Sequence, residues 1–159
     1  MRALADSPFL ADVVELDLGE AELCAEGAAA LAGAAWLSRL RRLDLDRNDV
    51  GDAGALALAA SPGLAGLVRL SLRGNGLTDR AACALAESPH VGRVRRLDLS
   101  SNLFGDEGAL ALARSPYLHP LLTLVIPRGR IGDAGVAALG ERFGERLWLD
   151  GRPSSRSVY

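Results

Sequence analysis

The chain contains no lysine and no glutamine, and it has few aromatic residues and few cysteines. All 18 of its basic residues other than histidine are arginine. We interpret this one-sided usage as the codon bias of a GC-rich genome, such as a bacterial one. The alternative interpretation is an arginine surface selected for binding. Because 49% of the residues are hydrophobic but only 4% are aromatic, the core must be built from leucine, alanine and valine.

The chain also lacks an excess of charge of one sign and long apolar runs. Its formal net charge is −2, which argues against the basic footprint of a nucleic-acid-binding protein. Apolar stretches such as Ala55–Ala60 are far shorter than the roughly 20 residues that cross a bilayer, so no membrane partner is expected. Residues 1–12 have no continuous apolar core, and we therefore expect no secretion signal.

A leucine-rich pattern recurs with a step of 27 residues. The motif is Leu-x-x-Leu-x-Leu-x-x-Asn, and a fixed period in this range predicts a leucine-rich solenoid. The leucines that mark successive copies are Leu16, Leu43, Leu70, Leu97 and Leu124. The asparagine falls at Asn48, Asn75 and Asn102, where we expect its amide to satisfy backbone groups at the end of each strand.

Each copy reads as a strand, a turn and a helix. In one copy, alternation over Arg42–Leu45 predicts a strand with Leu43 and Leu45 inward. The Ala/Leu-rich segment Ala53–Ala60 predicts a helix, which Ser61-Pro62 should end because proline cannot donate a backbone hydrogen bond. An aspartate recurs where each helix starts, and we expect it to cap its own helix rather than to bind metal. These residues are Asp52, Asp79, Asp106 and Asp133.

The repeat resembles a known family. Its pattern, Leu-x-x-Leu-x-Leu-x-x-Asn-x-[Leu/Val/Phe]-x-Asp-x-Gly-x-x-x-Leu, is similar to the ribonuclease-inhibitor-like leucine-rich repeats. The resemblance covers roughly residues 3–140, and the Ser-Pro ending is similar to versions in large bacterial repeat proteins. It implies an α/β fold: a right-handed solenoid with parallel strands on the concave face and short helices on the convex face. It also implies protein–protein binding as the usual role. The residues that carry it in one copy are Leu43, Leu45, Asn48, Val50, Asp52, Gly54 and Leu58.

We expect one leucine-rich repeat domain over residues 1–150. It would contain a partial repeat at 1–12, about five repeats from 13 to 142 and a closing segment at 143–150. Residues 151–159 are predicted to be a disordered tail. The two cysteines, Cys24 and Cys83, lie two repeats apart and beyond the roughly 7 Å Cα separation of a disulfide, so a reduced, cytoplasmic protein is expected.

The two ends depart from the repeat. Leu147 and Leu149 alternate with other residues and predict a short closing strand. Residues 1–10 read as the tail of a repeat whose strand is missing, which leaves Val13–Leu18 as an exposed strand edge. Three explanations stay open: residues 1–10 cap the solenoid, the chain is a fragment of a longer array, or a second subunit covers the edge.

Stacking the outward strand positions predicts a charged concave face. One column is Glu15, Arg42, Arg69, Arg96, Thr123; the next is Asp17, Asp44, Ser71, Asp98, Val125; the third is Gly19, Asp46, Arg73, Ser100, Pro127. Two interpretations compete: a self-neutralising Arg/Asp lattice, or a groove for an acidic protein partner. The candidate partner-binding residues are Glu15, Arg42, Asp44, Asp46, Arg69, Arg73, Arg96 and Asp98.

A second candidate surface is a rim of rings. The position after each Ser-Pro, or after Ala34-Ala35 in the copy where Ser-Pro is replaced, holds Phe9, Trp36, Gly63, His90 and Tyr117 in successive copies. The four rings either form a contact strip for a partner or pack on neighbouring residues and shield the core.

Enzyme chemistry has little support in the sequence. His90 and His119 fall at different repeat positions, and Gly74-Asn75-Gly76 lacks the further glycine and the lysine of a phosphate-binding loop. We therefore predict no catalytic residue, no cofactor and no metal. The leading hypothesis is a protein-binding module that uses its concave Arg/Asp face. The alternative is a structural or self-assembling repeat segment, with homo-oligomers forming through the N-terminal edge.

Overall fold

The structure is a computed structural model that describes residues 2–150 and 152–153. It contains one seven-stranded sheet in the order β1-β2-β3-β4-β5-β6-β7. The first six strands run parallel to one another and β7 is antiparallel to β6. The strands are β1 Glu15–Asp17, β2 Arg42–Asp44, β3 Arg69–Ser71, β4 Arg96–Asp98, β5 Thr123–Ile126, β6 Leu147–Leu149 and β7 Arg152–Pro153.

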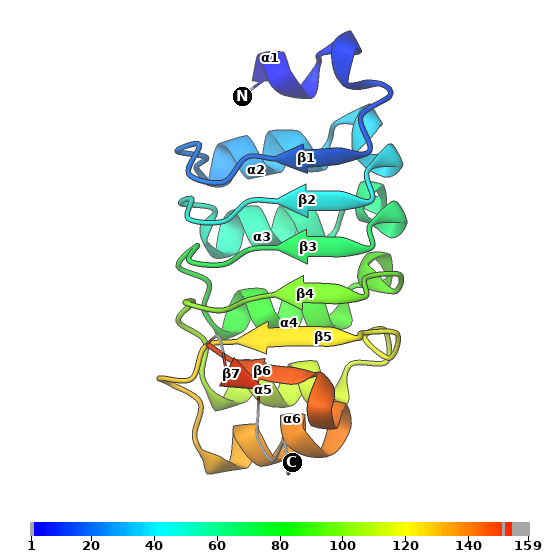
Figure 1. Ribbon diagram of the computed structural model, residues 1–159. Helices are drawn as coiled ribbons and strands as arrows, with labels where there is room; N and C mark the ends of the chain where they lie inside the picture. Colours follow the sequence, from blue (N-terminus) through cyan, green and yellow to red (C-terminus); the bar gives the residue numbers. More distant parts are fainter. Residues whose placement is uncertain (1, 151, 154–159) are drawn as a thin grey trace.

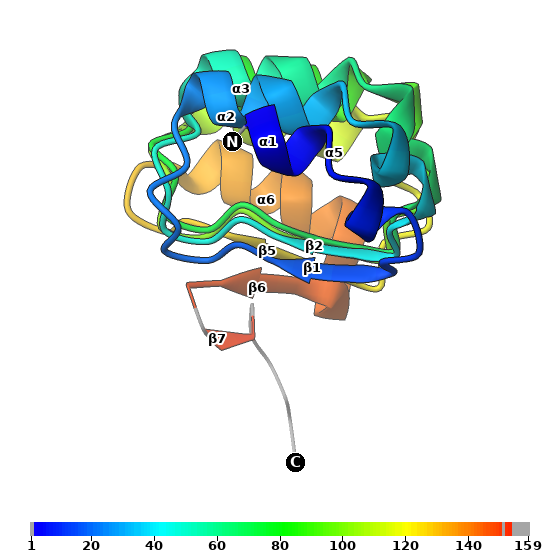
Figure 2. The same cartoon turned by 90° about the horizontal axis from the view of Figure 1, so that it is seen from above.

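Helices alternate with the strands and cover one face of the sheet. In Figure 1 the strands stack in one layer and the helices lie behind them, and Figure 2 shows the same two layers from above. The α-helices are α1 Arg2–Ala5, α2 Ala25–Ala32, α3 Gly51–Ala59, α4 Asp79–Glu87, α5 Asp106–Arg114 and α6 Asp133–Phe143. Short 3-10 helices are η1 Pro8–Leu10, η2 Ala35–Arg39, η3 Pro62–Gly66, η4 Pro89–Val91 and η5 Gly144–Arg146. The predicted α/β solenoid, with strands on the concave face and helices on the convex face, is confirmed.

The register of the sheet follows the sequence period. Leu43, Leu70 and Leu97 are register partners in successive strands, and each of them is buried. Arg42, Arg69 and Arg96 form the neighbouring column on the solvent side. Because side chains alternate along a strand, the period places these three leucines in the core and these three arginines on the solvent side. The first two predicted columns of the concave face, from Glu15 to Thr123 and from Asp17 to Val125, are therefore confirmed, and the third stays a prediction.

The asparagines tie each strand end to its neighbours, as predicted. Asn102 accepts the amide protons of Asn75 (2.9 Å) and Leu77 (3.1 Å) at Oδ1. Its Nδ2 donates to the carbonyls of Leu72 and Leu99, both at 2.9 Å. The side chain is buried, so each of these backbone groups would lose its hydrogen bond without it.

The Ser-Pro pairs end the helices and also join adjacent repeats. Ser88 Oγ accepts the amide proton of His90 at 3.2 Å and donates its own proton to the carbonyl of Ala59, at the end of α3. Ser61 and Ser115 make the corresponding pair of bonds. Thus the carbonyl that the ended helix leaves free is satisfied by the serine of the next repeat.

The prediction that each aspartate caps its own helix is wrong. Asp79 Oδ1 accepts the amide protons of Gly105 (2.8 Å) and Gly108 (2.7 Å), at the start of α5, the next helix. Asp106 Oδ1 does the same for Gly132 (2.9 Å) and Gly135 (3.2 Å) at the start of α6. Asp79 and Asp106 are themselves the first residues of their helices. Both aspartates thus stand one position after the N-cap of their own helix, and the start of the neighbouring helix lies within hydrogen-bond reach of their side chains.

Close helix packing explains the glycine that recurs two residues after this aspartate. A Cβ on Gly135 would lie 2.5 Å from Asp106 Oδ1 and 2.7 Å from Ile131 Cγ2. In α4 the same position is Ala81, and there Asp52 instead accepts the amide (2.8 Å) and hydroxyl (2.6 Å) protons of Thr78.

Three further expectations concern the thiols and the ends of the chain. Cys24 and Cys83 are free thiols, as expected. The predicted closing strand is β6, which pairs with β5. Arg152–Pro153 forms β7, and the rest of the predicted disordered tail lies outside the described residues. Within the described part of the chain, no helix is long and apolar enough to cross a membrane.

Candidate binding surface on the concave face

The arginine column lines a shallow groove on the solvent side of the sheet. Arg42, Arg69 and Arg96 stand at the first positions of β2, β3 and β4. The groove has a volume of about 250 Å³, and Thr123 and Val125 of β5 line its far end. Arg42 is half-buried, whereas Arg69 and Arg96 are exposed.

These arginines differ in their partners. Arg42 Nη2 lies 3.7 Å from Asp44 Oδ2, and its Nη1 lies 4.0 Å from Glu15 Oε2. Among the described residues, no carboxylate oxygen lies within 4.0 Å of the guanidinium of Arg69 or Arg96. The lattice that would neutralise the column is therefore present at Arg42 and absent at the next two strands.

The aspartates are engaged by the backbone instead. Asp98 Oδ1 accepts the amide proton of Ser100 at 2.9 Å and its hydroxyl proton at 2.6 Å. Asp44 Oδ1 accepts the amide proton of Asp46 at 3.1 Å. Such a bond to the residue two positions ahead holds the turn that leaves the strand. The carboxylates thus face the end of each strand, while the arginines stand at its start.

Asp46 joins two strands at this acidic end. Its Oδ1 accepts the hydroxyl proton of Ser71 and the amide proton of Arg73, the latter at 3.1 Å. Burial raises the pKa of Asp44 above its ordinary value, and the nearby carboxylates of Asp46 and Asp17 act in the same direction. The amide proton from Asp46 and the charge of Arg42 oppose this rise. A carboxylate of a binding partner is therefore disfavoured at this end of the groove, where the protein's own carboxylates already lie close together.

More arginines stand just before the strands, and sequence reasoning did not single them out. Arg41, Arg93 and Arg95 line a hollow of about 370 Å³ with Gly66 and Val68. Arg41 Nη1 donates to the carbonyl of Gly66 at 2.7 Å. The pattern that could have revealed them is the doubled arginine at the start of two repeats, Arg41-Arg42 and Arg95-Arg96. They extend the basic character of the strand starts around the edge of the sheet.

A tryptophan stands at the C-terminal end of the same face. Trp148 of β6 is the register partner of Val125 and is 38% exposed. With Arg73 and Asp150 it lines a hollow of about 310 Å³. The alternation in the closing strand already places Trp148 on the face opposite Leu147 and Leu149, although sequence reasoning did not single it out as a site residue.

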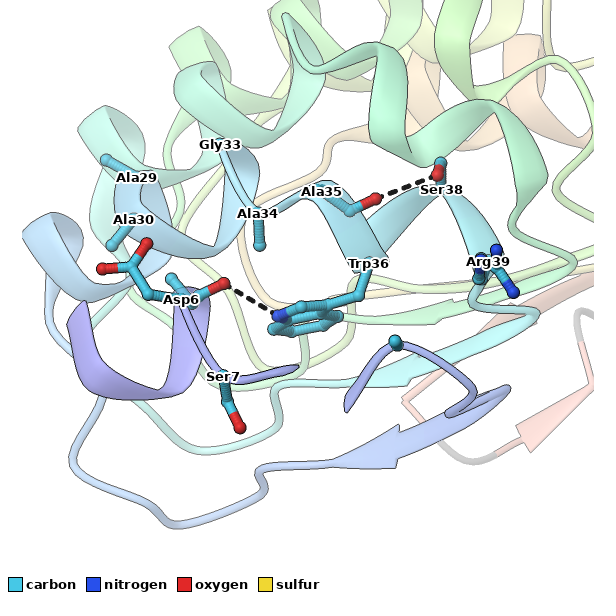
Figure 3. A pocket seen from close by; sticks show the side chains of 12 residues that line it. Asp6, Ser7, Ala29, Ala30, Gly33, Ala34, Ala35, Trp36, Ser38 and Arg39 are labelled. Atoms are coloured by element: carbon cyan, nitrogen blue, oxygen red, sulfur yellow. Dashed lines mark hydrogen bonds between the residues drawn. The ribbon is translucent and has the colours of Figure 1, made fainter. Parts of the chain in front are cut away.

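The rim of rings is not uniform. Phe9 is 91% exposed, whereas Trp36 is only 5% exposed. His90 and Tyr117 are half-buried. Trp36 Nε1 donates to the carbonyl of Ala5 at 2.9 Å, beside a hollow of about 930 Å³ (Figure 3). The rim as a binding strip therefore stays a prediction, and Trp36 already has a partner within the chain.

The N-terminal hollow of Figure 3 offers little for chemistry. Much of its wall is formed by small residues, Ala29 and Ala30 of α2 and Gly33 and Ala34 directly after that helix. Asp6, Ser38 and Arg39 lie at its margin. In the described part of the chain, no group of three or more His, Cys, Asp or Glu side chains could hold a metal ion.

Parallel strands, stacked helices and the asparagine ladder together define an α/β leucine-rich-repeat solenoid. A Leucine Rich repeat family model matches residues 38–59, which include β2 and α3, and residues 94–113, which include β4 and most of α5. These two segments are therefore similar to leucine-rich repeats. No curated protein matches the chain. Repeats of this kind typically mediate protein binding and are usually non-catalytic.

Proposed function

We propose that this chain is a non-enzymatic binding module whose concave face binds a protein segment rich in carboxylates. The observation that carries the proposal is the pair Arg69 and Arg96, which are exposed beside the groove with no carboxylate oxygen within 4.0 Å among the described residues. Arginine suits this role because its planar guanidinium can donate two parallel hydrogen bonds to one carboxylate.

The spacing of the column favours an extended or helical acidic segment that crosses the strands. Adjacent strands lie about 4.8 Å apart, so the guanidinium groups of Arg69 and Arg96 can serve successive acidic side chains of one partner. Arg42 already shares its charge with Asp44 and Glu15, and it contributes less. Most of the binding free energy is therefore expected to come from Arg69 of β3 and Arg96 of β4.

The acidic ends of the strands support a defined orientation. Asp44 and Asp98 line the groove, and their carboxylates are bonded to amides at the ends of the strands, away from the arginines at the strand starts. Like charges brought together cost free energy, so a carboxylate-rich segment is directed towards the strand starts. Trp148 and Val125 offer an apolar contact at one end of the face.

The test uses a fluorescein-labelled decapeptide of glutamate and alanine, and a matched peptide with glutamine in place of glutamate. We expect the glutamate peptide to bind and its affinity to fall with added salt, because exposed charges are screened over about 8–10 Å. Arg69→Glu with Arg96→Glu should weaken binding by roughly tenfold or more.

The control is Arg80→Glu with Arg114→Glu, which changes the net charge equally on the exposed helical side. This control should bind as the wild type does. Equal losses in both double variants would reduce the effect to net charge and overturn the proposed groove, as would equal affinity for the glutamine peptide.

A further inference from the structure

Strand β1 has one open edge. The carbonyl of Val14 accepts the amide proton of Arg42 at 3.2 Å, and the amide of Leu18 donates to Asp44 at 2.9 Å. Backbone groups alternate in direction along a strand, so those of Glu15 and Asp17 point away from β2. No strand within the described residues pairs with that side.

The apolar surface at this end is incompletely covered. Leu16 and Leu18 are half-buried, whereas Leu43 and Leu45, the corresponding residues of the next repeat, are buried. Val14, directly before the strand, is 50% exposed. Figure 2 shows α1 over the helical layer, with β1 running uncovered along the sheet side. A strand added to β1 would bury this surface and pair the open backbone groups.

The charges at the edge of β1 indicate which side chains an added strand would need. Along the repeats, the carboxylates of the first copy pair with arginines of the second: Asp12 with Arg39 (3.4 Å), Glu15 with Arg42 (4.0 Å) and Glu20 with Arg47. The first copy has acidic residues at the positions where the second has arginines. A strand on the outer side of β1 therefore meets the carboxylates of Glu15 and Asp17, both exposed.

We propose that the β1 edge takes up an extended segment of another protein in which two basic residues flank one apolar residue. The basic side chains would lie opposite Glu15 and Asp17, and the apolar residue would extend the leucine layer beside Leu16. Main-chain hydrogen bonds hold such an added strand, and alternate side chains select it.

The same charges disfavour a second copy of this chain as the occupant. In an antiparallel pair of β1 strands centred on Leu16, Glu15 of each copy stands opposite Asp17 of the other. Like charges directly opposite each other are destabilising in a sheet. The edge site also differs in sign from the concave arginine groove, so the two surfaces select partners of opposite charge.

The probe is a labelled, end-blocked hexapeptide of alternating valine and arginine, compared by fluorescence anisotropy with one of alternating valine and glutamate. We expect the arginine peptide to bind roughly tenfold more tightly, from the two cross-strand charge pairs. Glu15→Arg should remove most of this preference. N-methylation of the peptide amides that would face β1 should abolish binding, since it removes main-chain donors and leaves the charges.

Two controls separate this proposal from the concave groove. Arg69→Gln with Arg96→Gln should leave binding of the arginine peptide unchanged. Light scattering should show a monomer across a concentration series. Retained binding of the N-methylated peptide, an unchanged preference in Glu15→Arg, or a wild-type dimer that the arginine peptide does not dissociate would each overturn the proposal.

Discussion

The two ends of the solenoid terminate the same repeat in different ways. At the C-terminal end Phe143 and Leu147 are buried, and β7 adds an antiparallel strand beyond β6. At the N-terminal end Leu16 and Leu18 are half-buried and β1 has no added strand among the described residues. Among the described residues, the outer side of β6 is therefore paired with a further strand and the outer side of β1 is not.

Arginine side chains complete the closed end. Arg146 Nη1 donates to the carbonyl of Leu121 at 3.1 Å, and Arg142 Nη2 donates to that of Ser115 at 3.0 Å. Both guanidinium carbons also lie over the ring of Phe143, at 5.8 Å and 6.0 Å from its centroid. Carbonyls of the previous repeat are thus satisfied without a further repeat. This difference shows that two things stabilise a solenoid end: hydrogen bonds to the backbone carbonyls that a further repeat would otherwise cover, and burial of apolar side chains.

The largest expected difference between the ends comes from truncating their core side chains. Phe143→Ala removes a buried ring and should lower the free energy of unfolding by about 3–5 kcal/mol. Leu16→Ala removes a half-buried side chain from the open edge and should cost about 1–2 kcal/mol, since less of its surface leaves water on folding.

Urea unfolding followed by circular dichroism measures both variants. Leu58→Ala, which removes a fully buried side chain near the end of α3, provides the matched reference for a central repeat. If Leu16→Ala were as costly as Leu58→Ala, the N-terminal end would be as well closed as the interior and the comparison would fail.

The fold was more predictable from sequence than the electrostatics of the concave face. The 27-residue step fixed which residues share a column, because parallel strands in register repeat the same side-chain direction. Whether Arg69 finds an acid depended on the direction of Asp98 and Asp44, which is set by their bonds to turn amides. No periodic pattern reports that direction.

The prediction that each aspartate caps its own helix failed for a related reason. Sequence places Asp106 at a helix start, but only the packing distance between neighbouring helices decides which helix its carboxylate reaches. The bonds of Asp106 run forward to Gly132 and Gly135. Trp148 was not singled out because the closing strand arrives before a full period has passed, so Trp148 belongs to none of the repeat's columns, even though alternation places it opposite Leu147 and Leu149.

A second comparison sets an interior aspartate against the last one. Asp106→Ala removes the acceptor of two amide protons at the start of α6 and should cost about 1–2 kcal/mol of stability. Asp133 occupies the same place in the last repeat, is exposed, and caps no following helix among the described residues. Asp133→Ala should therefore change the free energy of unfolding by less than about 0.5 kcal/mol.

Thermal and urea unfolding of the two alanine variants distinguish a cap in the next repeat from a cap in the same helix. Equal losses would mean that each aspartate stabilises its own helix through its charge near the N-terminus. Asp106→Asn should retain part of the stability, because its amide oxygen still accepts a hydrogen bond.

The last comparison concerns the hydrogen bond that holds α1. Trp36 Nε1 donates to the carbonyl of Ala5 at 2.9 Å, beside the open hollow of Figure 3. Trp36→Phe keeps an aromatic ring but removes this donor, at a cost of about 0.5–1.5 kcal/mol. Because α1 has four residues and cannot form a stable helix alone, the loss should appear as faster amide exchange in residues 2–10.

Trp148→Phe is the matched control at the closed end, where the indole makes no hydrogen bond within the described residues, and it should leave amide exchange of α1 unchanged. Faster exchange of β6 in Trp36→Phe would show that the two ends open together, and the distinction between a closed and an open end would not hold.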